Sequence, residues 1–122
     1  MDQNRVDRAK EDYPQAKTTL DLRDVIADKD IDAVVISTCN HWHVLAAIWA
    51  CQAGKDVYVE KPISRTIEEG VEMVRAVEAS KQIVQTGTQQ RSWDHWILGK
   101  QIIDSGRLGQ ITFVHTYWYQ QA

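Results

Sequence analysis

Apolar residues along this chain follow two alternating patterns, short continuous runs and wider helical spacing. Continuous runs, mostly β-branched at their centres, occupy residues 33–38, 56–60 and 83–86. Runs of this length and composition are typical of strands that are buried on both faces, as in parallel sheets. We therefore expect three strands of this kind, and a further short strand at the β-prone residues 17–20.

The segments around these runs carry the signals of helices. The expected helices cover residues 4–13, a short stretch after residue 21, residues 41–52, a long stretch after residue 66, and residues 93–105. Asp21 and Thr66 have side chains that cap helix starts, and the glutamate three residues after Thr66 predicts a capping box. Gly54 and Gly106 are placed to end the helices that precede them.

The two central helices each present an apolar face that we expect to be buried. In the helix at 41–52 this face consists of Val44, Leu45, Ile48 and Cys51. In the helix after residue 66 it consists of Ile67, Val71, Val74 and Val77. Strands that alternate with helices of this length predict βαβ units and an α/β fold with a parallel sheet.

Composition and charge exclude several classes of function. A chain of 122 residues has the length of one domain, and its net charge of -3 with scattered basic residues argues against nucleic-acid binding. It contains no apolar run long enough to span a membrane, and its first residues lack the apolar centre of a signal peptide. Cys39 and Cys51 are too few for a disulfide scaffold, so we expect two free thiols, buried or partly buried.

Ligands of doubly wound sheets bind outside the carboxyl ends of the strands, so chemistry is sought in the residues after each strand. Glu60, Lys61 and Pro62 end one strand. The Lys61 amine, expected to be partly buried, is a candidate proton donor or acceptor, and Glu60 could orient it or bind hydroxyl groups. A cis bond before Pro62 would direct Lys61 into the cleft. Taken alone, the tripeptide fits a surface ion pair and a strand-ending proline better.

The turn that follows the first strand has the sequence Thr-Cys-Asn-His-Trp-His. Thr38 and Asn40 lie where a helix start favours anionic or carbonyl-rich ligands, although Asn40 could also serve only to cap the helix. Cys39, His41 and His43 lie close together in the sequence. No second Cys/His pair completes a zinc motif, so we expect no metal site.

The third strand end is followed by Gly87, which permits a sharp turn, and then by Gln89 and Arg91. Amide side chains here could hydrogen-bond a carboxamide or a hydroxyl-rich substrate, and a solvated loop is the alternative. Trp93 and Trp96 share one helical face. They could stack on a sugar ring, but hydrophobic packing is the role that we expect.

Taken together, these motifs resemble the Gfo/Idh/MocA family of glucose-fructose oxidoreductases, inositol dehydrogenases and rhizopine-catabolism proteins. The shared pattern consists of the turn from Thr38 to His43, a helix, Gly54-Lys55, a strand, Glu60-Lys61-Pro62, the stretch from Gly87 to Arg91, and Gly106-x-x-Gly109. The resemblance covers essentially the whole chain. The motifs are specific in combination, although none of them is specific alone.

The resemblance implies an N-terminal Rossmann domain that binds NAD or NADP, followed by an α/β domain with a large open sheet. The cofactor-binding residues that it implies are Thr38, Asn40, His43, Glu60, Lys61 and Gln89. It gives Lys61 the catalytic role, in contact with cofactor and substrate hydroxyl, where it helps to move the proton as hydride leaves. Glu60 would bind the nicotinamide-side ribose, Gln89 would lie near the nicotinamide, and Arg91 would support its loop. The family often holds the Lys-Pro bond cis.

Two features depart from the family pattern. Cys39 stands where the family usually has proline, which removes a fixed backbone angle from the turn. No Gly-x-Gly-x-x-Gly fingerprint occurs in the chain. We therefore expect the family's first strand and phosphate-binding loop to lie before Met1, and the catalytic Asp/His pair of the second domain to lie after Ala122.

The fold class expected is α/β, a partial Rossmann-type doubly wound parallel sheet plus the first strand of a missing C-terminal α/β domain. We expect residues 1–106 to form an incomplete NAD(P)-binding Rossmann domain. Residues 107–122 are expected to begin the C-terminal substrate and oligomerisation domain, with a strand over the aromatic residues 110–119. Such a fragment would leave strand edges unpaired.

We expect the chain to be a fragment of an NAD(P)-dependent oxidoreductase that transfers hydride between nicotinamide and a sugar or polyol hydroxyl, inactive alone. Two alternatives stay open: a non-catalytic Rossmann-like binding module, and NAD-dependent redox-neutral glycoside cleavage by the parent protein. The expected partners are a sugar-like small molecule and, for the parent, further copies of itself, but neither nucleic acid nor a membrane. A cytoplasmic location is expected, with export of the parent left open.

Overall fold

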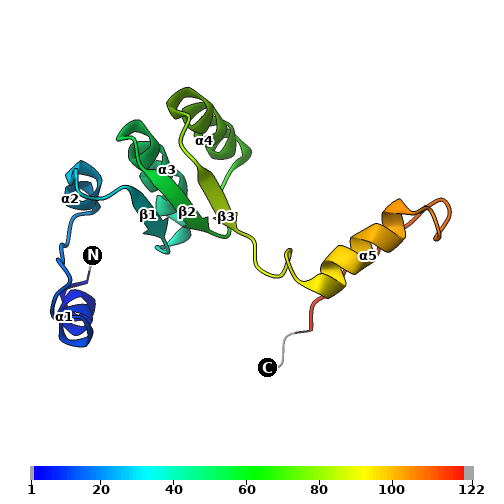
Figure 1. Ribbon diagram of the computed structural model, residues 1–122, viewed down its shortest axis with the longest axis horizontal. Helices are drawn as coiled ribbons and strands as arrows, with labels where there is room; N and C mark the ends of the chain where they lie inside the picture. The colour runs from blue at the N-terminus through cyan, green and yellow to red at the C-terminus, as the bar shows by residue number, and fades with distance from the viewer. Residues whose placement is uncertain (1, 120–122) are drawn as a thin grey trace. The chain divides into compact units, whose positions relative to one another are not determined.

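The computed structural model describes residues 2–119, which divide after Gly87 into two compact units. The first unit contains α1 (Gln3–Asp12), α2 (Leu22–Ala27), β1 (Ala33–Ile36), the 3-10 helix η1 (Asn40–Trp42), α3 (His43–Gln52), β2 (Asp56–Glu60), α4 (Ile67–Ser80) and β3 (Val84–Gly87) (Figure 1). The second unit contains α5 (Asp94–Asp104).

The three strands form a parallel sheet in the order β1-β2-β3. In its register Ile36 lies beside Val59, and Glu60 lies beside Gly87. Because all three strands run in one direction, their carboxyl ends meet at the same edge. The expected α/β fold with βαβ units is confirmed, and β2 is the middle strand.

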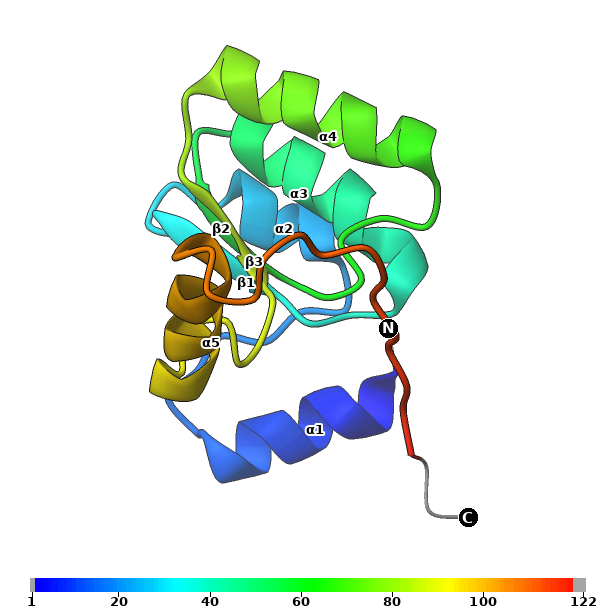
Figure 2. The same cartoon turned by 90° about the vertical axis from the view of Figure 1, so that its right-hand side faces the viewer.

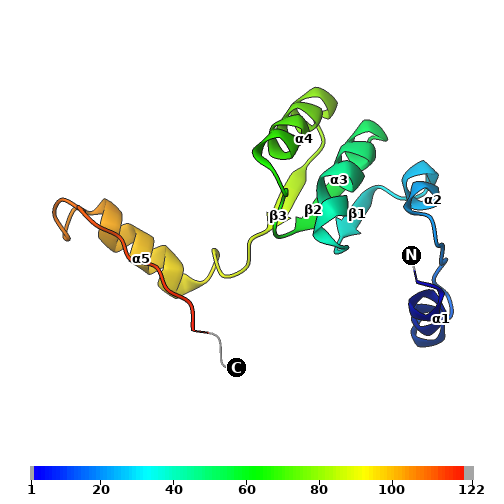
Figure 3. The same ribbon diagram turned by 180° about the vertical axis from the view of Figure 1, so that it is seen from behind.

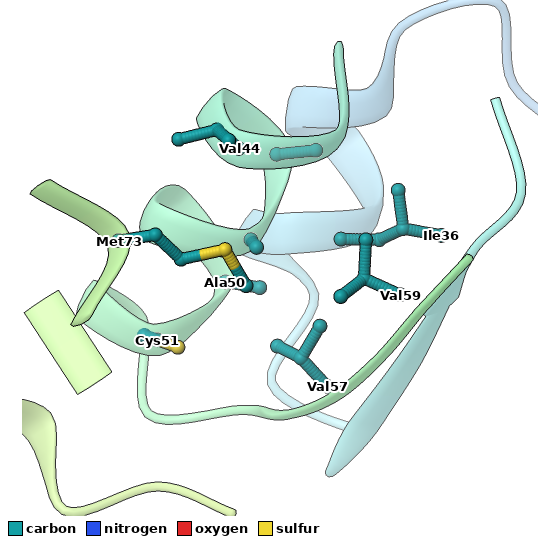
Figure 4. Close-up of a cluster of buried hydrophobic side chains, with 9 residues drawn as sticks. Ile36, Val44, Ala50, Cys51, Val57, Val59 and Met73 are labelled. Carbon is teal, nitrogen blue, oxygen red and sulfur yellow. The ribbon is translucent and has the colours of Figure 1, made fainter. Parts of the chain in front are cut away.

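Helices α3 and α4 cover one face of the sheet (Figures 2 and 3). The buried core lies between these helices and the sheet. It consists of Ile36, Val44, Ala46, Ala47, Ala50, Cys51, Val57, Val59 and Met73. In Figure 4, Val57 and Val59 approach α3 from the sheet and Met73 reaches toward it from α4. The side chain of Val35, which points to the opposite face, is 75% exposed. The expectation that the strands are buried on both faces is therefore wrong for residues 2–119, because the described helices of the sheet cover one side.

The helix ends follow the expected local chemistry. The Asp21 carboxylate accepts a hydrogen bond from the backbone N–H of Arg23 (2.9 Å), as an N-cap does. The Thr66 hydroxyl accepts from the backbone N–H of Glu69 at 3.2 Å. The Glu69 carboxylate reaches back to the N–H of Arg65 rather than that of Thr66, so the capping box closes one residue early. Gly54, at φ +76°, ends α3 as expected.

The buried faces of the two central helices agree with those expected only in part: Val44 and Cys51 are buried, and Ile48 and Val77 pack against the core. On α4 the buried residue is Met73, at 3% exposure, whereas Ile67 is 82% exposed and Val71 and Val74 also face solvent. On α3, Leu45 is exposed, and the core side is formed largely by Ala46, Ala47 and Ala50. Small side chains let two helices approach closely, and the long, flexible methionine fills the remaining space.

Two expected strands are absent from residues 2–119. Residues 17–20 and 110–119 have no regular secondary structure. A strand is stabilised by hydrogen bonds to a neighbouring strand, and neither segment pairs with β1, β2 or β3. The last three residues of the expected C-terminal segment, 120–122, lie outside the described part of the chain. Among the helices in residues 2–119, none is long and apolar enough to cross a membrane.

Candidate functional site

The carboxyl edge of the sheet brings together the turns that follow β1 and β2. Thr38 lies two residues beyond β1, and Lys61 follows the last residue of β2, Glu60. Glu60 in turn lies beside Gly87, the last residue of β3. Five residues predicted for the site therefore belong to one unit and one edge: Thr38, Asn40, His43, Glu60 and Lys61.

His43 connects the two turns. It is the first residue of α3, its side chain is 1% exposed, and both ring nitrogens face backbone carbonyl oxygens. Its Nδ1 lies 2.8 Å from the Pro62 oxygen, and its Nε2 lies 3.1 Å from the Thr38 oxygen. A neutral imidazole donates from one nitrogen, so either tautomer makes one of these hydrogen bonds. The ring thus fixes the turn after β1 against the turn after β2.

The Glu60-Lys61-Pro62 turn has the cis Lys61-Pro62 bond that the resemblance implies. The Lys61 side chain is exposed, so the expected partial burial of its amine is wrong: no described residue covers the end of β2 at this point. Glu60 and Lys61 form no ion pair among residues 2–119. Instead, the Lys61 backbone N–H donates to the Glu60 carboxylate at 3.2 Å.

The turn after β1 exposes its polar groups. Asn40 begins η1 but does not cap it, because the N-cap is Cys39, and the N-cap of α3 is Trp42. The interpretation of Asn40 as a helix cap is therefore wrong. The Thr38 hydroxyl donates to the carbonyl of Cys39 at 3.3 Å. Cys39 itself is an exposed free thiol, against the expectation of burial, whereas Cys51 is buried.

Gln89 and Arg91 belong to the second unit. They line a cavity of about 660 Å³ together with Gln90, Trp96, Ile97, Gly99, Lys100, Gln101 and Ile103. Trp93 and Trp96 are each more than half exposed. The packing role expected for these two rings is therefore wrong for the described residues. Their ring contacts within this unit are with His95, which lies between them in the sequence.

Two residues near Glu60 were not predicted for the site. Tyr58 stands two positions before Glu60 on β2, so both side chains point to the same, uncovered face of the sheet. Gly87 was expected only to permit a turn, yet the end of β3 is covered by the Tyr58 and Glu60 side chains. The period-two alternation of a strand is the signal that places Tyr58 with Glu60.

The donor set suits hydroxyl-rich and amide-bearing ligands. Exposed groups at the edge are the Thr38 hydroxyl, the Asn40 amide and the Lys61 amine, with the half-buried Glu60 carboxylate beside them. A carboxylate accepts hydrogen bonds from ribose hydroxyls, and an amide pairs with a carboxamide. Within residues 2–119, no group of three His, Cys, Asp or Glu side chains could hold a metal ion.

Comparison with known proteins identifies an oxidoreductase family that this chain matches. The model of an oxidoreductase family with an NAD-binding Rossmann fold, Gfo/Idh/MocA, matches residues 2–88. Inositol 2-dehydrogenase of Salmonella typhimurium is 36% identical over 106 residues, which cover 86% of this chain and 32% of that protein. Levoglucosan dehydrogenase of Pseudarthrobacter phenanthrenivorans is 39% identical over 101 residues, 82% of this chain and 26% of that protein.

A solved structure is similar as well. The WlbA dehydrogenase of Chromobacterium violaceum, crystallised in complex with NADH and UDP-GlcNAcA, aligns with a TM-score of 0.80 at 30% identity. The alignment covers 88% of this chain and 31% of that one. The chain spans less than a third of the length of each of these three proteins.

Proposed function

We propose, from the premise that this chain belongs to the Gfo/Idh/MocA oxidoreductase family, that it is the nicotinamide-side part of a longer NAD(P)-dependent oxidoreductase. The observation that carries the proposal is the edge of the sheet where Glu60 ends β2, Lys61 follows it, and His43 contacts the turn that they begin. Similarity to inositol 2-dehydrogenase and levoglucosan dehydrogenase supports a sugar or polyol hydroxyl as the reacting group.

The roles proposed for the residues are those that the family resemblance implies. A bound nicotinamide would accept or supply the hydride. The Lys61 amine would take the proton from the substrate hydroxyl, or return it, and its exposed position leaves it accessible to a substrate. Glu60 would accept hydrogen bonds from the nicotinamide-side ribose, with Thr38 and Asn40 along the dinucleotide. Gln89 would lie near the nicotinamide, and Arg91 would support its loop.

His43 enters this proposal in a modified form. The resemblance implies that it lines the dinucleotide. Its side chain is buried, however, and both ring nitrogens face backbone carbonyl oxygens. We therefore infer that His43 does not contact the cofactor but holds in place the two turns whose residues would bind it. The cofactor is NAD or NADP, and similarity to a protein crystallised with NADH supports NAD.

The domain organisation, oligomeric state and location that we propose are those that the family resemblance implies. Residues 1–106 would be the incomplete Rossmann domain, and residues 107–122 would begin the substrate and oligomerisation domain. The longer protein would be a cytoplasmic homo-oligomer.

The chain alone would be poorly stable, inactive and weak in NAD binding. It has the uncovered sheet face at Val35 and an exposed aromatic segment that includes Phe113 and Trp118. It also lacks a glycine-rich fingerprint for the pyrophosphate. Differential scanning calorimetry and isothermal titration with NAD test this part. A cooperative melt together with micromolar NAD binding by the 122-residue chain would contradict it.

The catalytic role is tested in the longer protein with Lys61→Ala. Turnover is expected to fall by about 10²–10⁴ while the circular dichroism spectrum is retained, because a positioned acid or base contributes a factor of that order. Lys29→Ala is the matched control, since Lys29 is an exposed lysine of the first unit, away from the carboxyl edge.

Unchanged turnover in Lys61→Ala, or no activity in the intact protein, would favour the non-catalytic binding module. Glycoside cleavage without net formation of reduced nicotinamide would identify the redox-neutral alternative. A Lys61→Ala variant that loses net oxidation of a polyol supports the oxidoreductase.

A further inference from the structure

The space beside Gly87 is occupied by two polar side chains from the neighbouring strand. A Cβ placed on this glycine would lie 2.7 Å from the Tyr58 hydroxyl oxygen and 2.9 Å from Oε1 of Glu60. The carboxylate carbon of Glu60 would be 3.0 Å away. Carbon and oxygen atoms that are not bonded do not approach so closely, so any other residue at this position would displace one or both side chains.

The strand register produces this arrangement. Glu60 lies directly beside Gly87 in the β2–β3 pairing, and Tyr58 lies two residues earlier on the same strand. All three therefore belong to the face of the sheet that α3 and α4 do not cover. The backbone of Gly87 does not adopt a positive φ, so conformation alone does not require glycine here. What requires it is the room that the missing side chain leaves.

We propose that Gly87 is a positioning residue for Glu60, with the Tyr58 hydroxyl as the side wall that confines the carboxylate. The glycine lets the Glu60 side chain lie over the end of β3. There its other oxygen, Oε2, accepts the backbone N–H of Lys61. The Lys61 N–H thus holds one oxygen of the carboxylate, while Gly87 leaves room for the other oxygen, and the Tyr58 hydroxyl borders the same space.

This inference rests on the proposed role of Glu60 toward the ribose of a dinucleotide. A carboxylate held in one orientation loses less conformational freedom when a hydroxyl binds it than a freely rotating one does. The corner formed by Gly87, Tyr58 and Glu60 is therefore expected to set the affinity for the dinucleotide without touching the reacting atoms.

The test is Gly87→Ala, which adds one methyl group to the occupied space. The atoms it displaces are the ends of two flexible side chains, so we expect the fold to be retained. In the ligand-free protein, the amide proton resonance of Lys61 should shift, because its hydrogen-bond acceptor moves. In the longer protein, the Kd for NAD or NADP should rise by about tenfold, the effect of losing one hydrogen bond of about 1.4 kcal/mol.

Lys29→Ala is the control, because Lys29 is an exposed residue of the first unit, away from the carboxyl edge. It should leave both the Lys61 resonance and the Kd unchanged. Tyr58→Phe provides a second variant that removes the side wall and adds no bulk, and a smaller rise in Kd is expected. If Gly87→Ala does not fold, Tyr58→Phe alone decides: an unchanged Kd and an unchanged Lys61 resonance overturn the inference.

The Glu60→Ala background separates the inference from the proposed function. If Gly87 acts through Glu60, Gly87→Ala should cause no further loss of affinity in that background. Additive losses, or a Lys61 resonance that does not move, overturn the positioning role. If Glu60→Ala leaves the affinity for the dinucleotide unchanged, the proposed function of Glu60 fails, whatever Gly87→Ala does to the Lys61 resonance.

Discussion

Nδ1 of His43 lies 2.8 Å from the carbonyl oxygen of Pro62, a residue 19 positions away in the sequence. This contact joins the first turn of α3 to the turn after β2. The second ring nitrogen faces Thr38, so a single buried side chain spans both loops of the carboxyl edge. The position of Lys61 therefore depends on a contact that is made by Pro62, the next residue in the chain.

Replacing this ring with an apolar one of similar size tests that dependence. In His43→Phe, the part-buried carbonyl that accepts from the ring loses its donor, and the free energy of unfolding is expected to fall by about 1–3 kcal/mol. Urea denaturation measures the loss. His41→Phe is the control, since His41 is exposed, and it should change stability by less than about 0.5 kcal/mol. Equal effects of the two substitutions would contradict the bridging role.

Lys55 is a second buried polar residue, at 4% exposure, and its amine supports the loop before β1. Nζ donates to the carbonyl oxygens of Asp28 at 2.6 Å and Ile31 at 2.7 Å. Lys55→Met keeps the aliphatic stem and removes both hydrogen bonds. We expect a loss of about 2–3 kcal/mol, because hydrogen bonds to a charged group are the stronger kind. Thermal unfolding measures it, with Lys29→Met as the control. Wild-type stability in Lys55→Met would show that these bonds contribute nothing.

The two thiols should differ sharply in reactivity. Cys39 is exposed, whereas Cys51 is 2% exposed and its burial raises the pKa of its thiol. Because the thiolate is the reactive form, a disulfide reagent should modify one cysteine rapidly in the native protein and two in denaturant. In Cys39→Ser the rapid phase should disappear. A rapid phase that persists in Cys39→Ser would mean that Cys51 is accessible.

The cap of α2 predicts a pH dependence. The Arg23 side chain hydrogen-bonds the Asp21 carboxylate and holds its pKa at about 2, below the ordinary value of 3.8. Since the folded pKa is lowered, the stabilisation is present above the ordinary pKa and is lost as the pH falls from about 4 through 2. Carboxyl NMR titration should show this midpoint, and Arg23→Ala should move it back toward the ordinary value. Arg8→Ala, an exposed arginine of α1, should leave it unchanged.

Local signals in the sequence predicted much of the fold. Caps depend on one or two neighbouring residues, so Asp21, Thr66, Gly54 and Gly106 could be assigned from the sequence alone. The buried face of α4 could not, because this helix carries two apolar stripes. One contains Ile67, Val71 and Val74, and the other contains Met73. Which stripe faces the core depends on the alanine surface of α3, which lies more than 20 residues away in the chain.

The candidate site was predictable where a residue follows a strand, because the carboxyl ends of parallel strands share an edge. Glu60, Lys61 and Thr38 follow from that rule. Tyr58 and the space beside Gly87 require the register of β2 against β3, which the sequence does not state. The burial of His43 was missed for a related reason. Its partners are the backbone carbonyls of Thr38 and Pro62, and every residue has such a carbonyl, so the sequence does not indicate which ones a side chain will contact.

Alternate residues of the middle strand, β2, have two different roles. Val57 and Val59 enter the core, while Tyr58 and Glu60 face the candidate site. A deletion or insertion of one codon within residues 56–60 would exchange these two sets, placing a carboxylate among the buried apolar side chains and a valine over Gly87. Changes in the length of β2 would therefore abolish folding and ligand binding at once. Evolution can vary this strand by substitution, but its length is fixed by the two faces together.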